Sequence, residues 1–224
     1  MASTDYVLNG IALRRKLQSV GWVHRIEVAV DAFAAAVLLA LFSPVMLVIA
    51  WSIWRLDGSP VLFAHHRVGH GGRVFRCFKF RSMRLDSAQM LAELLRTDPV
   101  AREEWHRDQK LTNDPRITPI GQFLRRTSLD ELPQLFNVLR GEMRLVGPRP
   151  ITVTELHRYG AARWHYLCVR PGVTGLWQVS GRNDTTYEER VSLDRTYVEQ
   201  RSWWFDMVIL FRTIRVVLNR SGAR

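Results

Sequence analysis

The longest apolar stretch of the chain runs from Ala32 to Trp54, which is 23 positions without a charged residue. This length is sufficient for an α-helix to cross the hydrocarbon core of a bilayer. Ser43-Pro44 interrupts the stretch near its middle, and proline kinks or breaks a helix there. Hydropathy alone therefore leaves two forms open, a spanning helix and a helix broken at Ser43-Pro44.

Basic residues lie on both sides of this stretch. They are Arg14, Arg15, Lys16 and Arg25 before it, and Arg55, Arg67, Arg73 and Arg76 after it. Because basic flanks favour the cytoplasmic side, both ends of the helix are expected on that face. We therefore predict a monotopic protein with a re-entrant helix over residues 26–55 that is broken at Ser43-Pro44. Residues 1–25 form a basic N-terminal extension, and residues 56–224 form a cytoplasmic domain.

Residues 61–81 predict two strands around a glycine-rich turn at residues 69–72. Within residues 78–81 the period of two places both phenylalanines on one face and the cations Lys79 and Arg81 on the other. Surface solvation is the ordinary role for such cations. An anionic ligand on that face is the alternative.

The remaining periodic segments are helical. They are residues 87–96, 100–110, 151–166, 187–200 and the amphipathic, basic segment 202–220. The last segment suits either the membrane interface or the domain core. The fold class is therefore α/β, mostly helical with a small sheet.

The candidate site lies in residues 127–135, where Asp130 and Glu131 are adjacent. Ser128 and Glu131 have the spacing of a capping box, which predicts that the two carboxylates occupy the first turn of a helix. Acidic residues there are most often simple capping residues. Six nearby arginines favour a site for an anionic substrate instead. They are Arg116, Arg125, Arg126, Arg140, Arg144 and Arg149. The carboxylate pair could hold a divalent metal, or one carboxylate could attack phosphorus.

The chain carries a net charge of +11, with a pI near 10.7. Partners of opposite charge include nucleic acid, anionic lipid and phosphorylated small molecules. No nucleic-acid partner is expected, because the basic residues are dispersed among glycine-proline loops without a recognition motif. Two such loops are residues 146–150 and 170–182, whose arginines suit phosphate oxygens. Cys77 and Cys168 lie far apart, with no disulfide or metal-site spacing.

Several linked motifs resemble those of the bacterial sugar transferase family, the monotopic polyprenyl-phosphate phosphoglycosyl transferases. The motifs are Lys79-Phe-Arg-Ser-Met83, Asp114-Pro-Arg116, Ser128-Leu-Asp-Glu-Leu-Pro-Gln-Leu-Phe-Asn-Val-Leu139, Val146-Gly-Pro-Arg-Pro150 and Arg170-Pro-Gly-Val-Thr-Gly-Leu-Trp-Gln-Val-Ser-Gly-Arg-Asn183. The resemblance covers roughly residues 26–220. Within the family it is closest to the short exopolysaccharide-initiating members that transfer galactose or glucose phosphate.

The resemblance implies transfer of a hexose-1-phosphate from a UDP-sugar to undecaprenyl phosphate, with release of UMP, at the inner (cytoplasmic) membrane. It assigns Asp130 as the nucleophile and Glu131 as a ligand that supports Mg²⁺. The candidate substrate-binding residues are Lys79, Arg81, Arg125, Arg149, Arg170, Gln178 and Arg182.

Two other classes of function stay open at this point. A membrane-tethered, non-catalytic binder of anionic lipid or polymer would also be basic, but it would tolerate the loss of Asp130. A hydrolase of UDP-sugars would release UMP without any polyprenyl acceptor. The sequence does not specify the hexose, and it is compatible with a homodimer.

Overall fold

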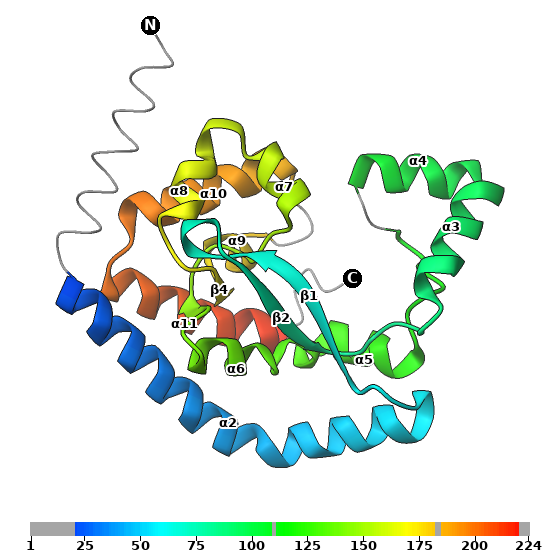
Figure 1. Ribbon diagram of the computed structural model, residues 1–224, viewed down its shortest axis with the longest axis horizontal. Helices are drawn as coiled ribbons and strands as arrows, with labels where there is room; N and C mark the ends of the chain where they lie inside the picture. The colour runs from blue at the N-terminus through cyan, green and yellow to red at the C-terminus, as the bar shows by residue number, and fades with distance from the viewer. Residues whose placement is uncertain (1–20, 109–110, 182–184, 220–224) are drawn as a thin grey trace, which may run out of the picture.

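The computed structural model describes residues 21–108, 111–181 and 185–219, so most of the predicted N-terminal extension and Arg182 lie outside the described residues. Figure 1 shows how the helices and strands of the described residues are arranged. The helices are α2 (Gly21–Asp57), α3 (Ser87–Thr97), α4 (Pro99–Asp108), α5 (Pro119–Thr127), α6 (Gln134–Leu139), α7 (Val153–Arg158), α8 (Arg163–Leu167), α9 (Leu176–Val179), α10 (Tyr187–Gln200) and α11 (Trp203–Asn219), with 3₁₀ turns η1 (His70–Gly72), η2 (Leu129–Glu131) and η3 (Gly160–Ala162). The strands are β1 (Leu62–Val68), β2 (Val74–Phe80), β3 (Arg144–Val146) and β4 (Gly172–Thr174). This confirms a mostly helical protein with little sheet.

Helix α2 is continuous through Ser43-Pro44, without the break predicted there, and it bends partway along its length (Figure 1). Proline at position 44 removes the N–H that would bond to the carbonyl oxygen of Ala40. The Ser43 hydroxyl donates to that same oxygen at 2.8 Å and so replaces the lost donor. From Arg25 to Asp57 the helix is long and apolar enough to cross a membrane.

The predicted hairpin is confirmed, with β1 and β2 antiparallel and Arg67 opposite Phe75. A second, parallel pair joins β3 to β4, which the loop patterns did not predict. In this pair the backbones of Gly147 and Gly172 approach so closely that a Cβ at Gly172 would collide with the Gly147 nitrogen. Glycine is therefore required where the two arginine-bearing loops meet.

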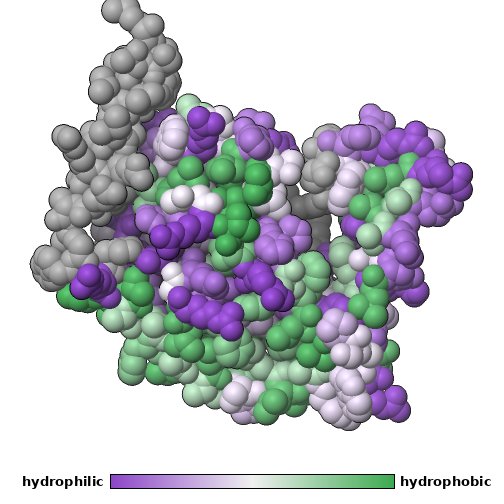
Figure 2. Space-filling view, viewed as in Figure 1, coloured by the Kyte–Doolittle hydropathy of each residue, from purple (hydrophilic) through white to green (hydrophobic). Residues whose placement is uncertain are grey.

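Helix α2 lies along one side of the domain and packs against α6, β3 and strand β2 of the hairpin (Figure 1). Ala35 shares one buried cluster with Cys77 and Leu135, and further along the helix Ile53 packs with Phe80. The opposite side of α2 is exposed and apolar. Figure 2 shows apolar surface along the lower edge of the molecule, and hydrophilic surface over α3 and α4.

The predicted charged helices at 87–96 and 100–110 are confirmed as α3 and α4, with residues 109–110 outside the described part of the chain. They project from the body in Figure 1. The single helix predicted over residues 151–166 is wrong, because Gly160 adopts a positive φ of 51° and the chain forms α7, η3 and α8 instead. The helices predicted at 187–200 and 202–220 correspond to α10 and α11.

Candidate functional site

The carboxylate pair occupies the short 3₁₀ turn η2 between α5 and α6. Ser128 ends α5 in the left-handed conformation, with φ 58° and ψ 15°, and its side chain caps no helix. Helix α6 begins only after Pro133, at Gln134. The predicted capping box is therefore wrong. The two carboxylates do lie in a first helical turn, but it is the 3₁₀ turn η2 and not the start of α6. A left-handed conformation is uncommon for serine, and such strained residues cluster at functional sites.

Lys79, on β2, is the cation nearest to the pair. Its Nζ lies 2.6 Å from Glu131 Oε1 and 3.7 Å from Asp130 Oδ2. Asp130 is buried, with 7% of its surface exposed. Burial raises the pKa of Asp130, while the Lys79 charge opposes that rise. The site thus keeps one carboxylate largely out of water beside a single ammonium group, which suits a reactive carboxylate better than a surface cap.

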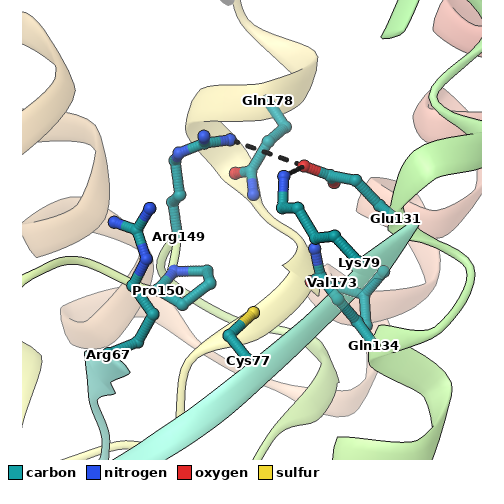
Figure 3. Close-up of a pocket in the computed structure, with 9 residues that line it drawn as sticks. All are labelled: Arg67, Cys77, Lys79, Glu131, Gln134, Arg149, Pro150, Val173 and Gln178. Atoms are coloured by element: carbon teal, nitrogen blue, oxygen red, sulfur yellow. Dashed lines mark hydrogen bonds and ion pairs between the residues drawn. The ribbon is translucent and has the colours of Figure 1, made fainter. Parts of the chain in front are cut away.

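Arg149 brings a second cation to the pair from the loop after β3. Its Nη1 lies 3.9 Å from Glu131 Oε1, and its guanidinium stacks over the ring of Trp177 at 5.4 Å from the centroid. Arg149, Lys79 and Glu131 line a pocket beside the carboxylate pair. Gln178, which follows Trp177 on α9, lines this pocket as well. The described residues that line it are Arg67, Cys77, Lys79, Glu131, Gln134, Arg149, Pro150, Val173 and Gln178, drawn in Figure 3.

Arg125 supports the pair from α5 rather than from the pocket lining. Its Nε donates to Ser82 Oγ at 2.9 Å. Burial lowers the pKa of Arg125, and the charges of Asp130 and Asp114 oppose that fall. Arg125 therefore contributes positive charge beside the buried carboxylate of Asp130.

Two of the predicted substrate-binding arginines, Arg81 and Arg170, do not line the pocket beside the carboxylate pair. Arg81 is buried, and its Nη2 donates to the carbonyl oxygens of Asp57 and Gly58, each at 2.7 Å, where α2 ends. Arg170 lies near the buried Arg144: burial lowers the pKa of Arg170, and the Arg144 charge lowers it further. The structure thus brings together Lys79, Arg125, Arg149, Gln178 and the carboxylate pair, without Arg81 and Arg170. Arg182 lies outside the described residues.

Sequence reasoning missed Arg67 as a site residue and counted it only among the basic flanks of the membrane helix. The register of the hairpin contains the missing signal, because Arg67 pairs with Phe75, and His65 with Cys77. Directly opposed residues share a face, so Arg67 lies on the same face as Cys77 and Lys79. Cys77 forms part of the pocket wall, and burial raises the pKa of its thiol.

Comparison with known proteins gives consistent matches over most of the chain. The chain is 53% identical over 193 residues to the undecaprenyl-phosphate galactose phosphotransferase of Salmonella typhimurium, and the match covers 86% of this chain and 40% of that protein. It is 49% identical over 193 residues to the exopolysaccharide production protein ExoY of Rhizobium meliloti, covering 86% and 85%. It is 39% identical over 194 residues to the UDP-glucose:undecaprenyl-phosphate glucose-1-phosphate transferase of Escherichia coli, covering 83% and 39%.

The chain thus spans about two-fifths of the length of the Salmonella and Escherichia relatives, but most of the Rhizobium relative. The model of the family described as bacterial sugar transferase matches residues 22–220. This range includes the membrane-type helix α2, the hairpin, the carboxylate pair and both glycine-proline loops. The chain belongs to the bacterial sugar transferase family.

Proposed function

We propose that the protein transfers a hexose-1-phosphate from a UDP-sugar to undecaprenyl phosphate and releases UMP. This would be the first step in assembling an exopolysaccharide or related glycoconjugate. The observation that carries the proposal is the buried Asp130 beside Glu131, with Lys79 and Arg149 placed against the pair. The names of the similar proteins support galactose or glucose as the sugar.

In the proposed reaction an Asp130 carboxylate oxygen attacks the phosphorus that bears the sugar. A bond forms between that oxygen and phosphorus, the bond from phosphorus to the bridging oxygen breaks, and its electron pair leaves with UMP. An oxygen of undecaprenyl phosphate then attacks the same phosphorus and releases Asp130. Covalent catalysis of this type divides one difficult transfer into two steps with ping-pong kinetics. The surrounding cations lower the repulsion between the carboxylate and the phosphate oxygens.

The carboxylate oxygens of Asp130 and Glu131 also suit Mg²⁺. We propose Mg²⁺ as the cofactor, with Glu131 as its principal protein ligand. Mg²⁺ commonly takes one or two carboxylates and completes its shell with water and substrate phosphates. Among the described residues no group of three or more His, Cys, Asp or Glu side chains is placed to hold a metal. The adjacent carboxylates of Asp130 and Glu131 match a site that depends on substrate oxygens. When bound, Mg²⁺ would neutralise charge on the diphosphate.

We further propose that α2 enters the cytoplasmic membrane and returns to the same face. Its bend partway along, the proline within it and its exposed apolar side support a helix that dips into one leaflet. Trp51 and Trp54, both more than half exposed, suit the interface near the end of the helix. This placement would bring the pocket to the surface where a soluble UDP-sugar and a membrane-embedded acceptor meet.

The re-entrant form predicts that both flanks of α2 face the cytoplasm. Variants lacking Cys77 and Cys168 would carry one new cysteine, either at Ser3 or at the exposed position Leu85. A membrane-impermeant maleimide should label both positions in inverted membrane vesicles and neither in intact cells. Labelling of Ser3→Cys in intact cells would instead establish a spanning helix.

The pH dependence of transfer should report the charge of Lys79. Asp130 must be ionised to attack phosphorus, so activity is lost as pH falls through its pKa. Because Lys79 holds that pKa down against burial, Lys79→Met should raise it. The acidic limb of the kcat/KM profile should therefore move to higher pH, and activity at neutral pH should fall. Arg76→Met, an exposed change on the same strand, is the control and should leave the limb in place.

The direct test is UMP release by the purified protein with Mg²⁺, a panel of UDP-sugars, and undecaprenyl phosphate present or absent. Release that requires the lipid and favours one UDP-sugar is the expected result, and it names the sugar. Release without lipid would identify a hydrolase instead. Lack of release with every donor, together with binding of anionic lipid, would favour the non-catalytic binder.

A further inference from the structure

The pocket contains a third cation, Arg67, for which the proposed attack by Asp130 has no role. Figure 3 shows that Arg149 lies between Arg67 and Glu131, so the cations extend away from the carboxylate pair. Lys79 and Arg149 are both placed against Glu131. Arg67 is further from the carboxylates, on strand β1.

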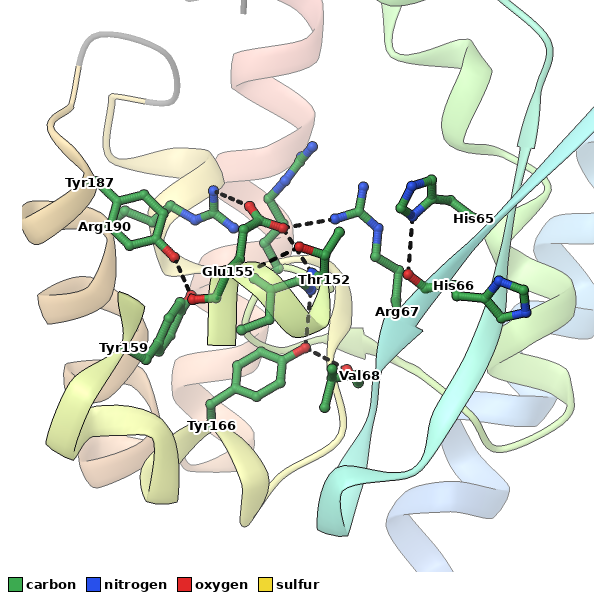
Figure 4. Close-up of polar contacts among 12 residues, drawn as sticks. His65, His66, Arg67, Val68, Thr152, Glu155, Tyr159, Tyr166, Tyr187 and Arg190 are labelled. Atoms are coloured by element: carbon green, nitrogen blue, oxygen red, sulfur yellow. Dashed lines mark hydrogen bonds and ion pairs between the residues drawn. The ribbon is translucent and has the colours of Figure 1, made fainter. Parts of the chain in front are cut away.

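Arg67 is held firmly in this position by Glu155. Its Nη1 donates to Glu155 Oε2 at 3.0 Å, and the same carboxylate accepts from the Thr152 amide at 2.8 Å in the capping box of α7. Figure 4 shows Glu155 between Arg67 and Arg190, whose Nη1 lies 3.5 Å from Glu155 Oε1. An arginine fixed in this way loses little conformational entropy when it binds a ligand.

Arg149 shares an aromatic ring with Arg190, the other arginine that Glu155 contacts. Arg190 stacks over Trp177 at 4.7 Å from the centroid, and Arg149 stacks over the same ring at 5.4 Å. The pKa of Arg67 is lowered by burial and next by the charge of Arg149. The fold thus holds two guanidinium groups near each other in a partly buried pocket, where their repulsion is weakly screened. An anion that contacted both would relieve that repulsion.

We propose that Arg67 and Arg149 form a clamp for the phosphate that leaves with the nucleotide. This inference rests on the proposed function. The phosphorus under attack must lie at Asp130, and the second phosphate is one bridging oxygen away. The pocket continues from Glu131, the neighbour of Asp130, past Arg149 to Arg67, so the second phosphate would lie between the two arginines. Negative charge grows on this phosphate as the bond to the bridging oxygen breaks, and N–H donors of the two guanidinium groups stabilise it.

The test compares UMP binding to Arg67→Gln, Arg76→Gln and the unaltered protein by isothermal titration calorimetry. Arg76 lies on the same hairpin, is exposed, and is absent from the pocket lining, so it controls for the loss of one positive charge. Arg67→Gln should weaken UMP binding by about ten- to a hundred-fold, as expected for lost hydrogen bonds to a charged group. Arg76→Gln should change it by less than about two-fold, within the usual range for surface positions. In the transfer assay Arg67→Gln should also raise the KM for the UDP-sugar and leave the KM for undecaprenyl phosphate unchanged.

The fold should survive the change, because Glu155 keeps Arg190 and the Thr152 amide as partners. A melting curve checks this, and Arg67→Lys provides the test if Arg67→Gln does not fold. Arg67→Lys should bind UMP more weakly than Arg76→Gln does, because lysine lacks the two-pronged donor. Equal UMP affinities in the folded Arg67 variant and Arg76→Gln, with transfer intact in the unaltered protein, would overturn the clamp alone. Lack of both transfer and UMP binding in the unaltered protein would overturn the clamp and the proposed function together.

Discussion

Asp130→Asn is expected to abolish sugar-phosphate transfer while leaving the protein folded and bound to membranes. The amide is nearly the same size as the carboxylate but lacks the nucleophilic anion, so the covalent step cannot occur. Loss of a nucleophile lowers turnover by roughly 10³-fold or more in enzymes that use covalent catalysis. Lipid-dependent UMP release from the preferred UDP-sugar measures this loss. Asp86→Asn, at an exposed aspartate paired with Arg84, is the matched control and should retain full activity.

Stability supplies an independent readout for the same variant. Because burial raises the pKa of Asp130 above its value in the unfolded chain, the ionised carboxylate destabilises the fold at pH values above that pKa. Asparagine removes that charge, so the melting temperature of Asp130→Asn at neutral pH should equal or exceed that of the unaltered protein. Normal turnover by a folded Asp130→Asn variant would exclude Asp130 as the nucleophile. A large loss of stability would show that the carboxylate has mainly a structural role.

The sequence contained enough local information to predict the hairpin and most of the helices. Strand alternation and the glycine-rich turn predicted β1 and β2, and the charged or amphipathic periodicity predicted α3, α4, α10 and α11. The elements that were missed are short. Three-residue strands such as β3 and β4 depend on contact between distant loops, which single-sequence periodicity does not report.

The turn that carries the carboxylate pair shows why local patterns can mislead. Ser128 and Glu131 have the spacing of a capping box, yet Ser128 is left-handed and Glu131 binds Lys79 from a distant strand. A capping box would require the Glu131 side chain to accept from the Ser128 amide, but this side chain instead accepts from Lys79 Nζ at 2.6 Å. The approximate site was therefore predictable from the carboxylates and arginines, whereas the conformation of the turn was not.

Alternation within the hairpin predicted the positions of the cations Lys79 and Arg81 only in part. It separated Lys79 and Arg81 from the phenylalanines but did not show that the chain leaves the strand after Phe80. Arg81 therefore turns to the carbonyl groups at the end of α2, while Lys79 faces the carboxylate pair. Extending the same alternation across the turn would have placed Arg67 on the same face of the hairpin as Lys79, because the hairpin register follows from the turn.

Arg144→Met is expected to cause the largest loss of stability of any change considered for this protein. Arg144, on β3, donates from Nε to Asp31 Oδ2 at 2.7 Å and from Nη2 to Asp206 Oδ2 at 3.2 Å. Its Nη1 also lies 3.8 Å from Glu27 Oε2. Because Glu27 and Asp31 belong to α2 and Asp206 belongs to α11, one buried cation joins the membrane-type helix to the domain.

Methionine keeps much of the length of the side chain but leaves Asp31 and Asp206 as buried carboxylates without that cation. Removing one partner of a buried ion pair typically costs about 3–5 kcal/mol. For a chain of this size that corresponds to a fall in melting temperature of about 6–20 °C. Thermal unfolding in detergent measures the change. Arg84→Met, which breaks the exposed pair with Asp86, should lower the melting temperature by no more than about 4 °C.

A rescue variant separates the cost of uncompensated charge from the loss of packing. Adding Asp31→Asn and Asp206→Asn to Arg144→Met removes the two carboxylates that lie closest to the arginine. If buried charge causes the loss, this triple variant should recover most of the melting temperature. Replacing a buried ion cluster by neutral groups is often tolerated even though removing one partner is not. Failure to recover would mean that the guanidinium itself is needed to hold α2 against β3 and α11.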